Sequence, residues 1–127
     1  MRIDEHHGVR VLLLEAEGEP ISTPDDATDL VGSAWSHQAE LIAVPVERLD
    51  PKFFRLKTGL AGEITQKLVN YRLRLAVVGD ISAHVGKSDA LRDYVRESNR
   101  ADHVWFVESE ADLERRLADR AGVRAGR

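Results

Sequence analysis

The clearest pattern in this sequence runs through residues 53–80, where a polar loop, an amphipathic helix, a turn and an apolar strand follow one another. Leu60, Ile64 and Leu68 recur at helical spacing and predict one buried helical stripe. Residues 73–78 carry apolar side chains at both strand parities, which predicts a strand buried on both faces. Such a strand needs a packed layer above and below it, so the stretch favours an α/β fold with a largely parallel sheet.

The rest of the chain alternates strands and helices in the same way. Gly8 can supply the positive φ of a tight hairpin between two short strands. Thr23 before Pro24 and two aspartates is a strong helix start. The predicted element order is β-β-α-β-α-β-α-β-α. The strands are predicted at residues 2–7, 9–15, 41–44, 73–78 and 104–107. The helices are predicted to be capped by Thr23, Thr58, Ser88 and Ser109.

This order predicts a mixed, mostly parallel sheet of about five strands with helical cover. We expect a single domain over residues 1–120. Gly122 is expected to stop the final helix, and residues 121–127 are expected to form a flexible tail.

Four aromatic residues are expected at particular places in this scheme. We expect Trp35 and Trp105 to pack in the core or partly at the surface. Phe53 and Phe54 are adjacent in an irregular segment, where both cannot easily be buried on one side. One of these two phenylalanines is therefore expected to face a partner.

Composition argues against several classes of function, namely those that need nucleic acid, a metal ion or a membrane. The formal net charge of −4 provides no basic field, so we expect no nucleic-acid partner. The absence of cysteine excludes disulfides and thiolate metal sites and is compatible with a reducing cytoplasm. His6 and His7 are adjacent on a predicted strand and face opposite sides, so we expect no metal and no other cofactor. The polar N-terminus and the lack of a long apolar run predict a cytoplasmic protein without membrane insertion.

The start of the central helix is the first candidate site. The hydroxyl of Thr58 can accept a hydrogen bond from an amide of the first helical turn, which makes it an N-cap. The same position could instead accept a phosphate or, with Gly59 beside it, present helix amides to an anion. Both interpretations stay open.

One face of the same helix is the second candidate. Glu63, Lys67 and Asn70 lie three and four residues apart and can touch, with a Glu63–Lys67 ion pair expected. They form either a solvated helix face or a polar contact surface for a partner.

The polar loop after the central strand is the third candidate. It contains Asp80, Ser82, His84, Lys87 and Ser88, and its aspartate and serines are typical of turns and helix caps. Loops at the carboxyl ends of strands are also where α/β sheets usually bind ligands. Gly86-Lys87-Ser88 matches only the end of a phosphate-binding loop motif, so this loop predicts a ligand site of unspecified chemistry.

Two resemblances follow from these blocks. The stretch FFRLKTGLAGEITQKLVNYRLRLAVVGD, with LRDYVRESNR downstream, resembles a bacterial family of unknown function, number 4180, over about residues 8 to 118. Thr58-Gly59-Leu60-Ala61 before a helix, Arg72-Leu73-Arg74-Leu75 before a strand, and the later block VWFVESEADLERRL more distantly resemble the STAS domain, in its SpoIIAA-like branch.

The STAS resemblance implies a domain that binds a protein partner without catalytic machinery, with a phosphorylatable residue at the position of Thr58. Leu56 and Lys57 stand where that family has an acidic residue. We therefore predict a non-enzymatic regulatory or binding domain that recognises a protein partner or a small ligand. A homodimer is one form that such a domain could take. The alternative is a small enzyme or metabolite-binding protein that uses the loop after the central strand.

Overall fold

The chain opens with a hairpin whose turn requires left-handed backbone. Strands β1 (Arg2–His6) and β2 (Val9–Leu13) pair antiparallel. His7 and Gly8 between them have φ values of 54° and 86°, the combination that a two-residue turn with the correct twist needs. The hairpin predicted at these residues is therefore confirmed.

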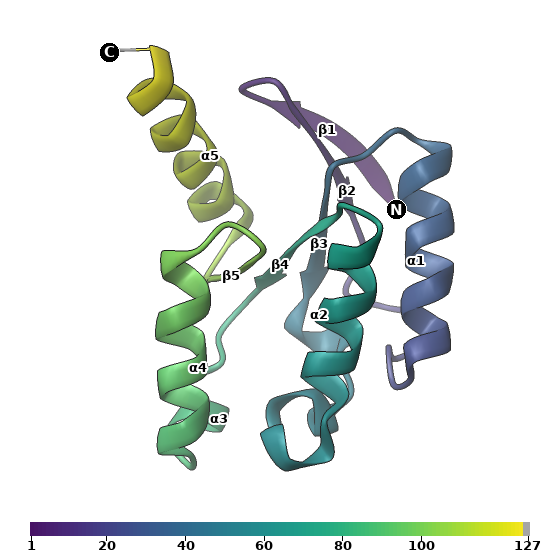
Figure 1. Cartoon of the computed structure of the whole chain (residues 1–127), viewed down its shortest axis with the longest axis vertical. Helices are drawn as coiled ribbons and strands as arrows, with labels where there is room; N and C mark the ends of the chain where they lie inside the picture. The colour runs from purple at the N-terminus through teal and green to yellow at the C-terminus, as the bar shows by residue number, and fades with distance from the viewer. Residues whose placement is uncertain (126–127) are drawn as a thin grey trace.

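The computed structural model describes residues 1–125, in which the remaining strands run parallel to β2 and each pairs with its neighbour in sequence (Figure 1). The predicted α/β fold with a mixed five-stranded sheet is confirmed. The elements after the hairpin are α1 (Pro24–Ser36), β3 (Leu41–Pro45), the 3₁₀ turns η1 (Val46–Arg48), η2 (Pro51–Phe54) and η3 (Leu56–Thr58), α2 (Leu60–Asn70), β4 (Arg74–Val78), α3 (Ser82–Val85), α4 (Asp89–Arg100), β5 (Val104–Val107) and α5 (Glu110–Ala125).

Helix α1 begins where its sequence predicts. The Thr23 hydroxyl accepts a hydrogen bond from the Asp26 amide at 3.3 Å, and Asp26 Oδ2 accepts from the Thr23 amide at 3.1 Å, which makes a reciprocal capping box. The Ser22 amide donates to the same carboxylate at 2.8 Å. These backbone donors stabilise the ionised form and lower the pKa of Asp26.

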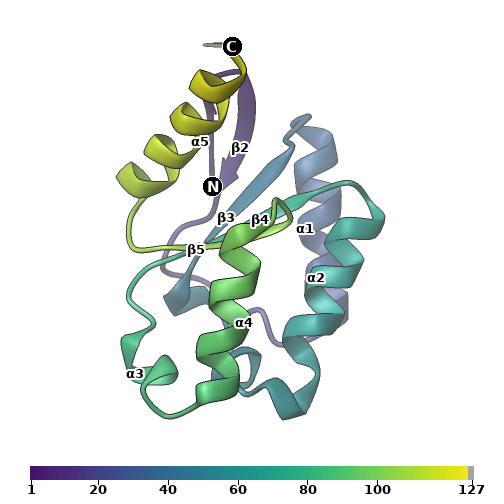
Figure 2. The same ribbon diagram turned by 60° about the vertical axis from the view of Figure 1, so that its left-hand side comes forward.

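The sheet separates two apolar cores. Helices α1, α2 and α4 pack on one face of the sheet (Figure 2). Ile64 and Leu68 of α2 are each 1% exposed there. Helix α5 alone covers the other face, and its Leu113 and Leu117 are buried against strands β2 to β5. The predicted anchoring of the final helix by these two leucines is confirmed. None of the helices within residues 1–125 is long and apolar enough to cross a membrane.

Trp105 closes the second core at the β5 edge. Its side chain is 1% exposed, and its indole N–H donates to the Ala101 carbonyl at 2.8 Å. The guanidinium groups of Arg74 and Arg116 lie 4.5 and 4.4 Å from the ring centroid. In cation–π contacts of this kind the guanidinium groups themselves cover the ring faces, and burial against the ring lowers the pKa of Arg116.

The outer edge of β5 is protected by a side chain. Asn99 Oδ1, at the end of α4, accepts a hydrogen bond from the Phe106 amide at 2.7 Å. The Asn99 carbonyl in turn accepts from the Arg116 guanidinium. An edge amide left unpaired would be available for pairing with another chain, so Asn99 satisfies it from within the domain.

Two aromatic residues differ from expectation. Phe53 and Phe54 are 1% and 4% exposed, so neither faces outward as predicted. The two rings meet edge to face at 5.2 Å because the η2 turn, rather than an extended segment, carries them. Trp35 is 61% exposed and packs edge to face on Tyr71 at 5.7 Å, which is the surface packing that was one of its two expected placements.

Two boundaries also differ. Residues 82–85 of the loop predicted after the central strand form the short helix α3. Helix α5 continues to Ala125 and therefore passes Gly122, where the sequence predicted its end. A single glycine costs a helix only about 1 kcal/mol relative to alanine, which its neighbours can offset. Of the predicted tail, residues 126–127 lie outside the described part of the chain.

Candidate functional site

A cavity of about 530 Å³ lies between the segment that precedes α2 and the segment that joins α3 to α4. This volume is typical of sites for small molecules, which occupy roughly 300–1,000 Å³. We call the cavity the basic pocket. It is lined by Pro51, Phe54, Arg55, Leu56, Lys57, Thr58, His84, Lys87, Ser88 and Ala90.

The wall before α2 is held by hydrogen bonds to its own backbone. Asp50 caps η2, with its Oδ1 accepting from the Lys52 amide at 2.9 Å. The Thr58 hydroxyl lies 2.8 Å from both the Lys52 and the Arg55 carbonyl oxygens, as donor, and accepts from the Leu60 amide at 3.2 Å. The wall is therefore a folded turn, although it contains little regular structure.

Thr58 is not the N-cap residue that the sequence predicted. That place belongs to Gly59, whose φ of 78° is accessible to glycine at little cost. Thr58 belongs to the preceding η3 turn, and its hydroxyl reaches an amide of the first helical turn from there. The hydrogen bond predicted for the Thr58 hydroxyl is therefore present, but the N-cap position in the backbone belongs to the next residue, Gly59.

Removing the Thr58 hydroxyl is expected to loosen this wall. Thr58→Val keeps the shape but deletes the bonds to two carbonyls and one amide, so the free energy of unfolding should fall by about 1–2 kcal/mol. Thr58→Ser keeps the hydroxyl and should stay within about 0.5 kcal/mol of the wild type. Urea unfolding measures both, and a Thr58→Val protein as stable as wild type would contradict this role.

The opposite wall comes from α3 and the first residues of α4. The His84 ring stacks on the Phe54 ring with a centroid distance of 4.2 Å and an interplanar angle of 10°. The Ser88 hydroxyl caps α4 by accepting from the Leu91 amide at 3.1 Å, as its sequence predicted. The Phe54–His84 stack thus connects two segments that are distant in sequence.

The charged groups of the basic pocket are all cationic or imidazole groups. Within residues 1–125, no aspartate or glutamate lines it. Arg55, Lys57 and Lys87 form no salt bridge within the same residues. By contrast, the three arginines on α4 are paired: Arg92 with Asp89 and Arg96 with Asp93, each at 2.7 Å, and Arg100 with Glu97 at 3.3 Å.

Asp80 and Ser82 lie outside the basic pocket. They border a smaller cavity of about 270 Å³ beside Val95 and Phe106. Asp80 Oδ1 accepts from the Ser82 amide at 2.9 Å, and this bond lowers the pKa of the Asp80 carboxyl. The carboxylate therefore organises the turn into α3, which is the capping role that the sequence left open.

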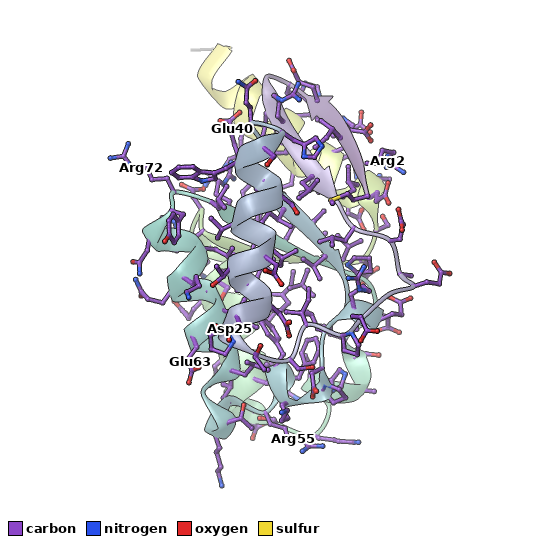
Figure 3. The ribbon with its side chains drawn as sticks, turned by 90° about the vertical axis from the view of Figure 1, so that its right-hand side faces the viewer. Arg2, Asp25, Glu40, Arg55, Glu63 and Arg72 are labelled. Carbon is purple, nitrogen blue, oxygen red and sulfur yellow. The ribbon has the colours of Figure 1, made fainter. Side chains whose placement is uncertain are left out.

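The polar face of α2 is also separate from the basic pocket. Lys67 Nζ donates to Thr28 Oγ1 of α1 at 2.9 Å, so the predicted Glu63–Lys67 ion pair is not formed among the described residues. Asn70 Oδ1 accepts from Gln66 Nε2 at 2.8 Å. Figure 3 shows Arg55 at one end of the molecule and Glu63 on the side of α2.

The structure thus unites part of two predicted sites and adds residues that the sequence analysis had not selected. Four of the candidates line one cavity: Thr58, His84, Lys87 and Ser88. The others lie outside it. Arg55 was not selected individually, because an isolated basic residue in an irregular segment carries no periodic signal. Among the described residues, no group of three or more metal-ligating side chains converges.

Comparison with known proteins identifies a family but no characterised relative. No curated protein and no solved structure matches the chain. A family model described as a domain of unknown function, DUF4180, matches residues 6–117, which include every element from β2 to β5 and both walls of the basic pocket. The chain therefore belongs to the DUF4180 family of domains of unknown function.

Proposed function

We propose that this protein is a non-enzymatic binding domain that holds a small ligand in the basic pocket. The observation that carries the proposal is the convergence of Thr58 with Lys87 and Ser88 on one cavity of suitable size. Its lining combines cations, hydroxyl groups and apolar surface, which are the components of a recognition site. His84 stacks on Phe54, an arrangement that favours a shape-forming role for this imidazole.

Filling the basic pocket tests the proposal. Ala90 is exposed, is the second residue of α4 and lines the cavity, so Ala90→Phe should occupy ligand space without disturbing the core. Ala111 is the matching exposed second residue of α5 and lies outside the pocket lining, which makes Ala111→Phe the control. A thermal-shift screen of a metabolite library against wild type and both variants supplies the measurement.

Compounds that raise the melting temperature of wild type and of Ala111→Phe should not do so for Ala90→Phe. The expected loss of affinity is at least about tenfold, or about 1.4 kcal/mol. Equal shifts in all three proteins would place the binding elsewhere. A library without effect on the wild type would count against a small ligand and favour a protein partner.

We also propose that the fold is of STAS (SpoIIAA-like) type and that the domain is regulatory and acts in the cytoplasm. The antiparallel opening strand, the sequential order of the strands and the helix start at Gly59 support the fold type, and the regulatory role and the location follow from the STAS resemblance alone. In such a domain, a protein partner or a second copy of the chain would bind differently to the ligand-bound domain than to the free domain. Size-exclusion chromatography with and without a ligand from the screen tests the second-copy version, since binding should change the elution volume.

A further inference from the structure

We propose that the ligand of the basic pocket is a small organic anion, namely a phosphate or carboxylate group joined to an apolar part. This inference rests on the proposed function, because it names the chemistry of the molecule that the pocket would hold. Its starting point is charge. Arg55, Lys57 and Lys87 give the lining a formal charge of +3, while the whole chain carries −4.

The three cations are available to a ligand. Most other basic side chains of the described residues have a partner: Arg48 donates to the Glu15, Glu17 and Glu19 carbonyls, and Lys67 donates to Thr28. Arg55, Lys57 and Lys87 form no salt bridge within residues 1–125. Unpaired cations that gather around one concavity raise the local concentration of anions there.

Two carboxylates that lie close in sequence to Arg55 and Lys87 are occupied elsewhere. Asp50 accepts a hydrogen bond from the Lys52 amide, and this bond is the main cause of the lowered pKa of the Asp50 carboxyl. The electrostatic attraction of that carboxylate to the charges of Lys52 and Arg55 lowers the pKa by less. Asp89 pairs with Arg92 at 2.7 Å. Neither carboxylate lines the cavity, so neither takes the place of an anionic ligand.

Hydroxyl and apolar groups complete the site. Ser88 uses its oxygen to accept from the Leu91 amide, so its O–H can still donate to a ligand oxygen. Pro51, Phe54 and Leu56 supply apolar surface beside the cations. An inorganic anion would leave this surface unused, whereas an anion with an attached ring or chain would bury it.

A series of four small probes with the same ring and different charges tests the inference. The probes are dianionic phenyl phosphate, monoanionic benzoate, neutral benzyl alcohol and cationic benzylamine, each titrated into uniformly ¹⁵N-labelled protein. Phenyl phosphate should shift the amide signals of Lys57, Thr58, Lys87 and Ser88 at the lowest concentration. Benzoate should follow, the other two should have little effect, and added salt should weaken both anions. The tighter binder of phenyl phosphate and benzoate shows whether the pocket prefers a phosphate or a carboxylate group.

Matched lysine variants separate the pocket charge from general charge. Lys87→Gln removes a lining cation and should weaken phenyl phosphate by about tenfold. Lys67→Gln removes a cation on α2 outside the pocket and should leave the affinity within about twofold. Circular dichroism and unchanged spectra away from the pocket verify that both variants are folded.

The possible failures are distinguishable. If benzyl alcohol or benzylamine binds as well as the anions and Ala90→Phe abolishes that binding, the anion inference is wrong and the proposed function stands. If Lys87→Gln and Lys67→Gln weaken phenyl phosphate equally, the anion inference is also overturned. If none of the four probes binds while the metabolite screen detects binding sensitive to Ala90→Phe, only the anion inference fails; if neither experiment detects binding, both fail.

Discussion

Ile64→Asp is expected to yield a chain that does not fold. Ile64 is 1% exposed and belongs to the core that α1, α2 and α4 share with the sheet. A carboxylate at this position would have no counter-ion in an apolar environment, and the cost of about 4 kcal/mol or more approaches the whole stability of a small domain. Circular dichroism should show lost helix, and urea titration should show no cooperative transition.

The control for this result is on the same helix. Gln66 is exposed on α2, so Gln66→Asp introduces the same charge into water and should lower the free energy of unfolding by less than about 1 kcal/mol. A soluble Ile64→Asp protein that unfolds cooperatively near the wild-type urea midpoint would show that the buried stripe of α2 is wrongly assigned.

The second large effect is expected at Asn99. Asn99→Ala removes the acceptor of the Phe106 amide and leaves a partly buried donor unsatisfied at the edge of β5. The free energy of unfolding should fall by about 1–3 kcal/mol. Hydrogen exchange at the Phe106 amide should accelerate more than exchange at amides in the interior of β4, because the change acts on the sheet edge.

Two variants isolate the acceptor. Asn99→Asp keeps an oxygen in position and should retain most of the stability. Asn70→Ala removes an exposed asparagine of α2 whose bond to Gln66 lies at the surface, so it should cost less than about 0.5 kcal/mol. Equal losses for Asn70→Ala and Asn99→Ala would contradict a special role for the β5 edge.

Most of the fold was predictable because burial follows a period that is visible within one segment. Ile64 and Leu68 repeat at helical spacing, and Thr23 with Asp26 forms the capping box that its sequence indicates. The strand at residues 73–78 was predicted because apolar residues on both parities need cover on both sides, and Leu75 and Ala76 are buried on opposite faces of the sheet. Local pattern and tertiary environment agree at these positions.

Positions that depend on distant partners were not predictable in the same way. Phe54 is buried because η2 curls and because His84, from a different element, stacks on its ring. Trp35 is exposed because α1 ends beside Tyr71 of the α2 terminus rather than beneath a further layer. Neither outcome follows from residue spacing, since each is decided by the packing of segments that lie far apart along the chain.

The candidate site shows the same division. Thr58, Lys87 and Ser88 could be selected individually, because hydroxyl and basic residues at predicted helix starts are chemically suggestive. Their meeting in one cavity required the parallel arrangement of the elements, which brings the segments before α2 and before α4 together at one end of the molecule. Glu63, Lys67, Asp80 and Ser82 looked equally suitable in sequence, and only their placement separates them from the basic pocket.

The sequential strand order has a consequence for synthesis on the ribosome. Each strand emerges after the strand with which it pairs, so the sheet can grow at one edge without insertion between existing strands. Helices α1, α2 and α4 can cover one face as the strands are added, whereas the opposite face waits for α5. A nascent chain that has not yet reached Leu113 therefore exposes Val11, Leu41 and Trp105 together, and this is the stage at which it is most open to aggregation or to chaperone binding.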